Sequence, residues 1–445
     1  MRSWRFAKLA HVWLVVPAVG VVLAAQQTIR DNSFLWHIQA GHLQASAGRV
    51  LTEDPFSLVY GGQPWRTQSW LLELVFAALG DDLRWVELYL AMVGGVTMLA
   101  IAVAIFSLTR SIRWTAALVV FVELFAFPFL TPRPVVVSFM FLGLLLVVLR
   151  SERLRWTIPL LMWVWAAVHG SFMLGLGLIV LEGLAFRDRR RVVDALAGTV
   201  SVTLTAHGSH AWETVATFYR SSESLAYMTE WSRPELGSRE VVPFLVLVAA
   251  VGAMFILRRI PIGQLWIALP FGVFGLSTTR AIMPAGLVLV ACLAIGVGRV
   301  ARGSEEASWP ATLLVVGFVG FAVVSMWPGI ARIDRERFPI DVAEALIDVP
   351  TFHDDVVGGY LIFRRLGPSR VFFDDRAELY PGEFVRSVIA ARSGADEWEL
   401  LFRAHDVEQA LLRRTDNLSQ VLARSPRWQE VAGDEEFGVW RLTAG

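Results

Sequence analysis

Long apolar stretches alternate with short charged loops over residues 9 to 328, whereas charged residues crowd the rest of the chain. A transmembrane helix needs about 20 largely apolar residues, within a range of about 17–25. The first stretch exceeds the roughly 7–15 residues of a signal-peptide core, so we expect an uncleaved helix there. The pattern predicts about eleven transmembrane helices, at residues 9–27, 85–108, 114–131, 134–149, 156–169, 172–186, 192–206, 241–257, 264–279, 281–298 and 310–327.

Basic loops orient these predicted helices. Arginines, together with the single lysine of the chain, gather in alternate short loops. Cytoplasmic loops carry such an excess, so this rule places the N-terminus in the cytoplasm and, for an odd number of spans, the C-terminal region outside. The residues are Arg2, Arg5, Lys8, Arg110, Arg113, Arg150, Arg153, Arg155, Arg187, Arg189, Arg190, Arg191, Arg258, Arg259, Arg299 and Arg302.

Three longer segments fall on the predicted outer side: 28–84, 207–240 and everything after Pro328. Long structured segments on one face indicate a site on that face. The last of them forms a separate predicted domain, 329–445, after a membrane domain that covers 1–328 and includes the loop 28–84. Strands and helices alternate in it, which predicts a small α/β domain, with helices at 342–347 and 384–391, strands at 356–363, 371–373 and 407–412, and a terminal hairpin of 428–431 with 437–442.

The first outer loop carries two short apolar segments. In one, apolar residues recur at helical spacing from Phe34 to Ala45, with His37 and Gln44 on the opposite face. We expect this helix to lie flat in the membrane interface. Residues 70–79 carry Glu73 and are too short to span, so they predict a second interfacial helix. An aromatic belt at the headgroup level fits the tryptophans of this region, Trp36, Trp65, Trp70 and Trp85.

Composition agrees with a membrane protein and excludes some partners. The 445 residues are 55% hydrophobic and 18% charged, with a mean hydropathy of +0.53. A formal net charge of zero gives no bulk attraction for nucleic acid. Cys292 is the only cysteine, which excludes an intramolecular disulfide and a cysteine-based metal site.

Acidic residues of the outer loop are candidates for catalysis. Asp31 is interpreted either as a general base acting on an acceptor hydroxyl or as the N-cap of the following helix. Asp54 precedes a proline and is interpreted as a second catalytic acid or as the start of a turn. His37 and His42 lie about 140° apart around a helix and cannot hold one metal ion together. No metal site is therefore predicted, although a divalent ion is not excluded.

Arginines on the predicted outer side are candidates for binding a lipid phosphate. Arg133 lies between two prolines, Arg233 follows Glu230 and Trp231, and Arg280 follows a run of hydroxyl residues. A guanidinium can hold a phosphate through paired hydrogen bonds, and the alternative is simple snorkelling at the interface.

Three further positions have open interpretations. His169, at an outer helix end, is interpreted as a substrate contact or an interface-anchored polar tip. Glu123, near the middle of a predicted span, is either functional or neutral and hydrogen-bonded to a neighbouring helix. The run Asp374-Asp375-Arg376 either reaches a membrane site or forms a solvated strand end.

The first outer loop resembles that of the GT-C superfamily of membrane glycosyltransferases. The resemblance lies in Asp31-Asn32-Ser33-Phe34-Leu35-Trp36-His37, Gly41, Gly48-Arg49-Val50 and Asp54-Pro55-Phe56-Ser57. It continues at Trp163 to Phe172, Glu230-Trp231, Thr279-Arg280, Gly358-Gly359-Tyr360 and Phe373-Asp374-Asp375-Arg376. It is most similar to an uncharacterised bacterial multi-spanning group, and more distantly to oligosaccharyltransferase catalytic subunits. Ser33 stands where that group often has a second acid, which weakens a metal-dependent interpretation.

The resemblance implies an α-helical polytopic protein of the bacterial cell membrane that moves a sugar from a polyprenyl-phosphate donor. The acceptor, a glycan, lipid or protein, would lie on the extracytoplasmic face, and membrane lipids would surround the helices. Asp31 and Asp54 would serve catalysis. Substrate contacts would come from Arg280, Arg133, His37, His169, Glu230 and Arg233. The alternative is a scaffold, an assembly factor or a transporter, because a fold does not by itself fix a function. No internal repeat of the transporter kind is visible.

Overall fold

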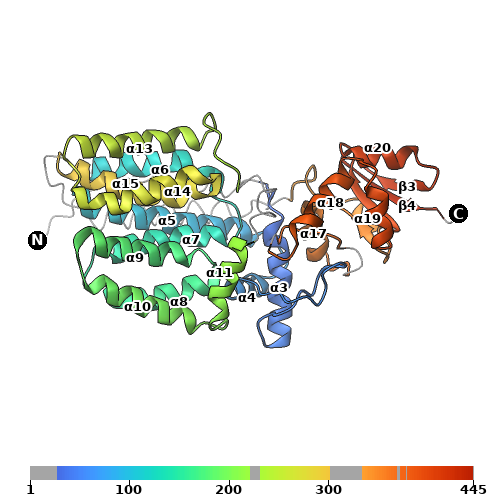
Figure 1. Ribbon diagram of the computed structural model, residues 1–445, viewed down its shortest axis with the longest axis horizontal. Coiled ribbons are helices and arrows are strands. Elements are labelled where there is room, and N and C mark those ends of the chain that lie inside the picture. The colour runs from blue at the N-terminus through green and yellow to red at the C-terminus, as the bar shows by residue number, and fades with distance from the viewer. Residues whose placement is uncertain (1–27, 221–230, 301–332, 368–370, 377, 444–445) are drawn as a thin grey trace, which may run out of the picture. The chain divides into compact units, whose positions relative to one another are not determined.

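The computed structural model describes residues 28–220, 231–300, 333–367, 371–376 and 378–443 (Figure 1). It is largely helical, with one small mixed sheet. The predicted helices at 9–27 and 310–327 lie outside the described residues, and so does Glu230. The chain divides into two units. The first contains Leu83–Ala211 and Thr229–Ala331, and the second contains Thr28–Asp82 and Arg332–Gly445. The loop that the sequence placed with the membrane helices therefore groups with the C-terminal region.

The first unit is a bundle of helices that run side by side (Figure 1). Each predicted span within the described residues is a helix, usually a few residues shorter than predicted. The α-helices are α5 (Trp85–Thr109), α6 (Ile112–Ala126), α7 (Val135–Val148), α8 (Ile158–Val168), α9 (Phe172–Phe186), α10 (Arg190–Thr203), α13 (Val241–Ile256), α14 (Leu265–Ser277) and α15 (Ile282–Gly298). The 3-10 turns are η1 (Phe127–Phe129), η2 (Arg155–Thr157), η4 (Ile262–Gln264) and η5 (Thr279–Ala281). A further helix, α11 (His210–Arg220), follows α10 and belongs mostly to the second unit.

Helix α15 forms the core of this bundle. Its residues are apolar on every side, and nearly all of them are buried against α5, α6, α7, α13 and α14. A helix that is apolar all round is expected at such a central position. The outer helices instead expose large apolar side chains to the surroundings, among them Met92, Leu196, Leu269 and Val273. The bundle is thus apolar both inside and on much of its outside.

Helix length separates two of these helices from the others. Trp85–Thr109 and the continuous helical stretch Thr279–Gly298 are long and apolar enough to cross a bilayer, by length and composition alone. Within the described residues five further apolar helices have 10–17 residues, and one of them, Trp70–Leu79, belongs to the second unit. At 1.5 Å per residue the shorter ones fall below the thickness of about 30 Å of the hydrocarbon core. Transmembrane crossing by these helices stays a prediction.

The arginines of the predicted cytoplasmic loops have a local structural role. Arg110 and Arg187 adopt the left-handed conformation at the C-caps of α5 and α9, with φ of 53° and 55°. A positive side chain at this end of a helix also complements the helix dipole. Buried carboxylates pair with other arginines of the same loops. Arg150 pairs with Glu182, and Asp194 lies 2.7 Å from Arg155 and 3.2 Å from Arg191.

The second unit contains the mixed sheet, in the order β1-β2-β4-β3. Strand β1 is parallel to β2, and the other two pairs are antiparallel. The hairpin predicted at the end of the chain is confirmed as β3 and β4, and the predicted strand 407–412 is confirmed as β2. The strands are β1 (Thr351–Phe352), β2 (Gln409–Arg413), β3 (Trp428–Gly433) and β4 (Phe437–Leu442); the helices are α3 (Ser33–Ala47), α4 (Trp70–Leu79), α17 (Asp355–Phe363), α18 (Gly382–Arg392), α19 (Trp398–Ala404) and α20 (Asn417–Arg424), and η6 (Ala343–Ala345) is one 3-10 turn.

An aromatic core joins the loop 28–82 to the C-terminal region. The buried cluster includes Phe352, Phe372, Phe384 and Trp440 beside β2, β4 and α18. Leu58, Val59 and Tyr60 of the loop pack against it. The backbone N–H of Leu58 also donates to the carbonyl of Val371 at 2.7 Å. These contacts explain why the loop belongs to this unit.

The predicted strand 356–363 is wrong, because this segment is helix α17. An unbroken apolar run of this length does not distinguish a buried strand from a buried helix. Asp354 caps the helix by accepting the N–H of Val357 at 2.8 Å. A Cβ atom at Gly358 would collide with the carbonyl oxygen of Phe373, and one at Gly359 would lie 2.7 Å from that of Asn32. The two glycines therefore allow α17 to pack closely on its neighbours.

Two smaller predictions for the C-terminal region also need correction. Residues 371–373 join no strand of the sheet, and the N–H of Phe372 instead donates to the ring of His353 at 2.9 Å. The helix predicted at 342–347 is only the 3-10 turn η6. The predicted helix 384–391 is confirmed as α18. Both failures concern segments of a few residues, where the sequence pattern is too short to show a period.

Candidate functional site

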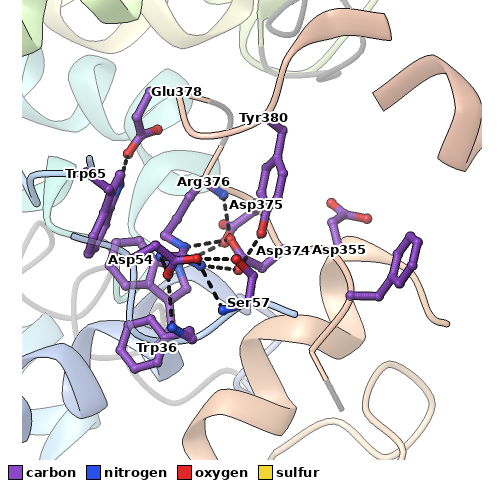
Figure 2. A network of polar contacts seen from close by, with 12 residues as sticks. Trp36, Asp54, Ser57, Trp65, Asp355, Asp374, Asp375, Arg376, Glu378 and Tyr380 are labelled. Atoms are coloured by element: carbon purple, nitrogen blue, oxygen red, sulfur yellow. Dashed lines mark hydrogen bonds and ion pairs between the residues drawn. The ribbon is translucent and has the colours of Figure 1, made fainter. Parts of the chain in front are cut away.

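A buried charge network lies in the second unit, where the loop 28–82 meets the C-terminal region (Figure 2). Arg376 is at its centre and is fully buried. Its Nη1 donates to Asp54 at 2.6 Å. Its Nε and Nη2 donate to the two carboxylate oxygens of Asp374 at 2.8 and 2.6 Å. Tyr380 donates its hydroxyl to Asp374 at 2.9 Å. One guanidinium thus serves two carboxylates that lie far apart in the sequence.

Aromatic rings surround this guanidinium. Its carbon lies 4.7 Å from the ring centre of Trp65, 5.2 Å from that of Phe56 and 5.9 Å from that of Trp36. The indole N–H groups point outward to other acids: Trp36 donates to Asp375 at 2.9 Å and Trp65 to Glu378 at 3.0 Å. Both tryptophans are buried, so they do not form the exposed aromatic belt that the sequence predicted.

The pKa values in this network follow from burial and from the guanidinium. Burial alone raises the pKa of Asp374, but the adjacent Arg376 outweighs burial and holds that pKa below its ordinary value. Burial lowers the pKa of Arg376, yet its carboxylate neighbours, Asp374 first, raise it well above the ordinary range. Burial and Asp374 raise the pKa of Tyr380, which stays a neutral donor. At neutral pH Asp374 is therefore ionised, Arg376 protonated and Tyr380 neutral.

Asp54 has a structural role in this network. It accepts the backbone N–H groups of Phe56 at 3.0 Å and Ser57 at 3.2 Å, together with the Ser57 hydroxyl. These bonds form the turn that its position before a proline predicts. Because Asp54 is also buried and paired with Arg376, it has no geometry for contact with an acceptor. We therefore withdraw the hypothesis of a catalytic Asp54.

Asp31 lies directly before helix α3. One carboxylate oxygen accepts the N–H of Ser33 at 2.9 Å, and the residue is 8% exposed. The N-cap position itself belongs to Asn32, whose side chain makes no capping bond and instead donates to the carbonyl of Asp355 at 3.3 Å. The N-terminal ends of α3 and α17 are therefore adjacent, because the N-cap of the first contacts the first residue of the second.

The carboxyl group of Asp355, at the start of α17, has a shifted pKa. Burial, and then the neighbouring carboxylate of Asp354, raise its pKa to about 6. A raised pKa means that the ionised form costs stability, which declines as pH rises from the unfolded value near 4 to about 6. At pH 7 we expect Asp355→Asn to increase the free energy of unfolding by about 1–3 kcal/mol, and the gain to vanish near pH 4. Urea titrations at the two pH values measure both effects.

His37 supports the packing of α3 on α4. Its Nδ1 lies 2.6 Å from Glu73, which is fully buried in α4 and also receives the Gln44 amide at 2.5 Å and the Thr67 hydroxyl. The polar face predicted for this helix is buried, because His37 and Gln44 both contact Glu73. A substrate contact by His37 has no support in this geometry. His42 pairs separately with Asp81 at 2.9 Å.

In the helical unit, the structure brings together two motifs that the sequence singled out. The backbone N–H of Thr279 donates to the carbonyl of Ser232 at 3.1 Å. The guanidinium carbon of Arg280 lies 5.4 Å from the ring centre of Trp231. Both side chains are partly buried. Arg280, in the 3-10 turn η5 immediately before the apolar helix α15, is thus held against the ring of Trp231.

The remaining predicted substrate residues have local contacts of their own. The carbonyl of Arg133 accepts the Tyr89 hydroxyl at 3.4 Å, and Arg233 is exposed. The Nδ1 atom of His169 accepts the N–H of Ser171 at 3.1 Å in the turn between α8 and α9. One carboxylate oxygen of Glu123, Oε1, is buried with no hydrogen-bond partner among the described residues, and both interpretations of this residue stay open.

Sequence reasoning missed the most highly charged buried site. For Asp374 and Arg376 one of the two interpretations was a solvated strand end. Neither residue was connected with Asp54. The sequence did contain a signal. An acid (Asp54) and tryptophans lie in one predicted outer segment and an arginine (Arg376) lies in another, and such residues can pair across two segments. Among the described residues no group of three or more histidine, cysteine or acidic side chains is arranged to hold a metal ion.

No family model matches the chain, and no curated protein matches it either.

Proposed function

We propose that this protein is a membrane glycosyltransferase that moves a sugar from a polyprenyl-phosphate donor to an extracytoplasmic acceptor. The observation that carries the proposal is the Arg280–Trp231 pair at the start of an apolar helix of transmembrane length. A phosphate that is attached to a long apolar chain needs this combination of a cation and an apolar helix. The resemblance of the outer loop to GT-C glycosyltransferases supports the same reaction class.

The surface of the helical unit supports membrane insertion. Large apolar side chains cover the outward faces of several helices, including Leu196 of α10 and Leu269 of α14. Water-soluble proteins expose large apolar side chains mostly singly, whereas these helices expose many of them. Basic residues and ion pairs gather at the helix ends that the loop charges place in the cytoplasm. The proposal therefore has the helices in the bilayer and the second unit outside the cytoplasm.

Arg280 is proposed to bind the donor phosphate. A guanidinium forms short, charge-assisted hydrogen bonds to phosphate oxygens, and the stacked indole restricts its orientation. Such bonds also stabilise the charge that develops on a phosphate leaving group. Arg133 and Arg233, with His169 and Glu230, stay candidates for further contacts in this proposal.

Asp31 is proposed to accept the proton of the acceptor hydroxyl. The bond from Ser33 holds one of its oxygens, so the carboxylate has a defined direction. The hydroxyl oxygen would attack the anomeric carbon opposite the phosphate, form the new glycosidic bond and release the polyprenyl phosphate. This displacement inverts the anomeric centre. Positioning of the two reactants supplies much of the rate in such reactions.

Purified protein is expected to carry a polyprenyl phosphate or its glycosylated form, detectable by native mass spectrometry in mild detergent. Arg280→Ala should lower the bound fraction about tenfold, since one charge-assisted hydrogen bond contributes about 1.5–3 kcal/mol. Arg239, an exposed arginine of the loop that carries Trp231, provides the control. Arg239→Ala should leave the lipid in place. Recovery of ordinary phospholipid alone, unchanged in Arg280→Ala, would contradict the donor assignment.

The second candidate is a non-catalytic scaffold or assembly factor. One specific observation favours it: three buried polar side chains of the second unit, Asp54, His37 and Arg376, make internal contacts. A scaffold needs this rigidity and no catalytic base. The two candidates differ in the expected effect of changing Asp31, because only the transferase depends on its charge.

A further inference from the structure

A cavity of about 330 Å³ opens on the C-terminal part of the second unit, at the edge of the sheet where β2 and β3 begin and β4 ends. This volume is at the lower end of the range of about 300–1,000 Å³ for small-molecule sites, and it fits about one or two sugar rings. Its lining combines aromatic rings with charged groups of both signs. The residues that matter for its chemistry are Trp398, Phe402, Trp428, Asp406, Glu408 and Arg427.

Aromatic side chains form one wall of the cavity. The ring of Phe402 lies edge-on to that of Trp398 at 5.1 Å and to that of Trp428 at 5.5 Å between centroids. The two tryptophans are each only 8% exposed, so core packing fixes their positions. Both indoles line the cavity, and neither indole N–H is bonded to another described residue, so each can donate to a ligand in the cavity.

Uncommitted charged groups form the rim. The side chains of Glu408 and Arg427 make no hydrogen bond or ion pair with other described residues. Glu399 and Arg403, by contrast, already pair with each other at 2.7 Å. Asp406 is held at the rim in the left-handed conformation, with φ of 50°. Acceptors and donors of hydrogen bonds therefore surround the aromatic wall.

We infer that this cavity binds a neutral saccharide. A sugar ring presents apolar C–H groups on its face, which suit a tryptophan wall, and hydroxyls around its edge. Hydroxyls both donate and accept, so they match Glu408 and Arg427 together, and their oxygens accept from the indole N–H groups. A purely apolar ligand would bury the charged rim without compensation. An anionic ligand would meet a rim with three carboxylates and two guanidiniums.

This inference goes beyond the proposed transfer reaction and does not rest on it. The cavity shares no residue with Asp31, Arg280 or the other candidates for that reaction. A saccharide site in this region gives the protein a means of holding a glycan, whether or not it also modifies one. Binding and transfer are therefore separable by experiment.

Saturation-transfer difference NMR on the full-length protein in detergent tests the inference. The probes are maltopentaose, cellopentaose, mannopentaose and chitopentaose, with glucose 6-phosphate as an anionic comparison. Saturation of the ring protons of at least one pentasaccharide is expected. Arg427→Ala and Glu408→Gln, both at the rim, should each weaken binding about tenfold, as expected for loss of one hydrogen bond to a charged group.

Two controls separate the outcomes. Arg424→Ala changes an exposed arginine of α20 outside the cavity and should bind as the unchanged protein does. Asp31→Asn should also bind normally, so failure of the transfer proposal leaves this result intact. The inference is overturned if no pentasaccharide binds to the folded protein, if both rim variants bind normally, or if the phosphorylated sugar binds more tightly than every neutral probe.

Discussion

Replacement of Arg376 by methionine is expected to lower the free energy of unfolding by about 3–5 kcal/mol, the usual cost of removing one partner from a buried ion pair. The variant leaves Asp54 and Asp374 buried without their shared cation. It also removes the cation from among three aromatic rings. Pulse proteolysis in urea, with cleavage followed in residues 332–445, measures the change.

Two control variants, Arg335→Met at the surface and Arg376→Lys in the network, show whether the loss of stability comes from the buried network. Arg335 forms an exposed pair with Asp341 at 2.9 Å, and Arg335→Met should cost less than about 1 kcal/mol. Arg376→Lys should restore little, because an ammonium cannot serve Asp374 through two bonds and also reach Asp54. Equal loss of stability in Arg376→Met and Arg335→Met would refute the structural role of the network.

The sign of the pH dependence gives a second readout for the same variant. Arg376 holds the pKa of Asp374 below its unfolded value near 4, so this pair stabilises the protein above that pH and loses its contribution in acid. Without Arg376, burial dominates and raises the pKa of Asp374. The contribution of this acid should then decrease as pH rises through 4 and beyond. Urea titrations between pH 3 and 7 distinguish the two slopes.

Asp31→Asn is expected to reduce sugar transfer by about 10²–10⁴-fold, the range for loss of a general base. Asparagine keeps an oxygen that accepts the N–H of Ser33, so the start of α3 should stay intact. What the variant loses is the ability to take a proton. The assay follows labelled sugar from synthetic polyprenyl-phosphate mannose, glucose, galactose and arabinose into acceptors of membrane vesicles that contain the protein.

A neighbouring acid provides the matched control for transfer. The backbone N–H of Asp334 donates to the carbonyl of Ile29 at 3.0 Å, and its side chain pairs with Arg30 at 2.6 Å. Asp334→Asn removes one charge from a segment that contacts Ile29 and Arg30, just before Asp31, and should leave transfer unchanged. If Asp31→Asn transfers sugar as fast as Asp334→Asn, Asp31 is not the base, and the scaffold function becomes the better account.

Local sequence patterns were sufficient to predict helices and strands whose apolar residues recur with a clear period. Both helices of the first outer loop were predicted to within a few residues, because helical spacing of apolar residues is a local property. The terminal hairpin was found from two β-forming runs around a polar turn. The same reasoning failed for 356–363, where Val357 to Ile362 are all buried and no periodicity remains to separate a helix from a strand.

Tertiary structure alone decided the roles of the candidate residues. Asp54 and Arg376 are 322 positions apart, and Trp36 and Asp375 are 339 apart, so no local pattern connects them. Their pairing turns a predicted catalytic acid and two predicted belt tryptophans into buried supports. The sequence determined where helices and apolar surfaces form, because these depend on neighbours along the chain. Which charges are buried together depends on the packing of distant segments, and only the folded structure decides that.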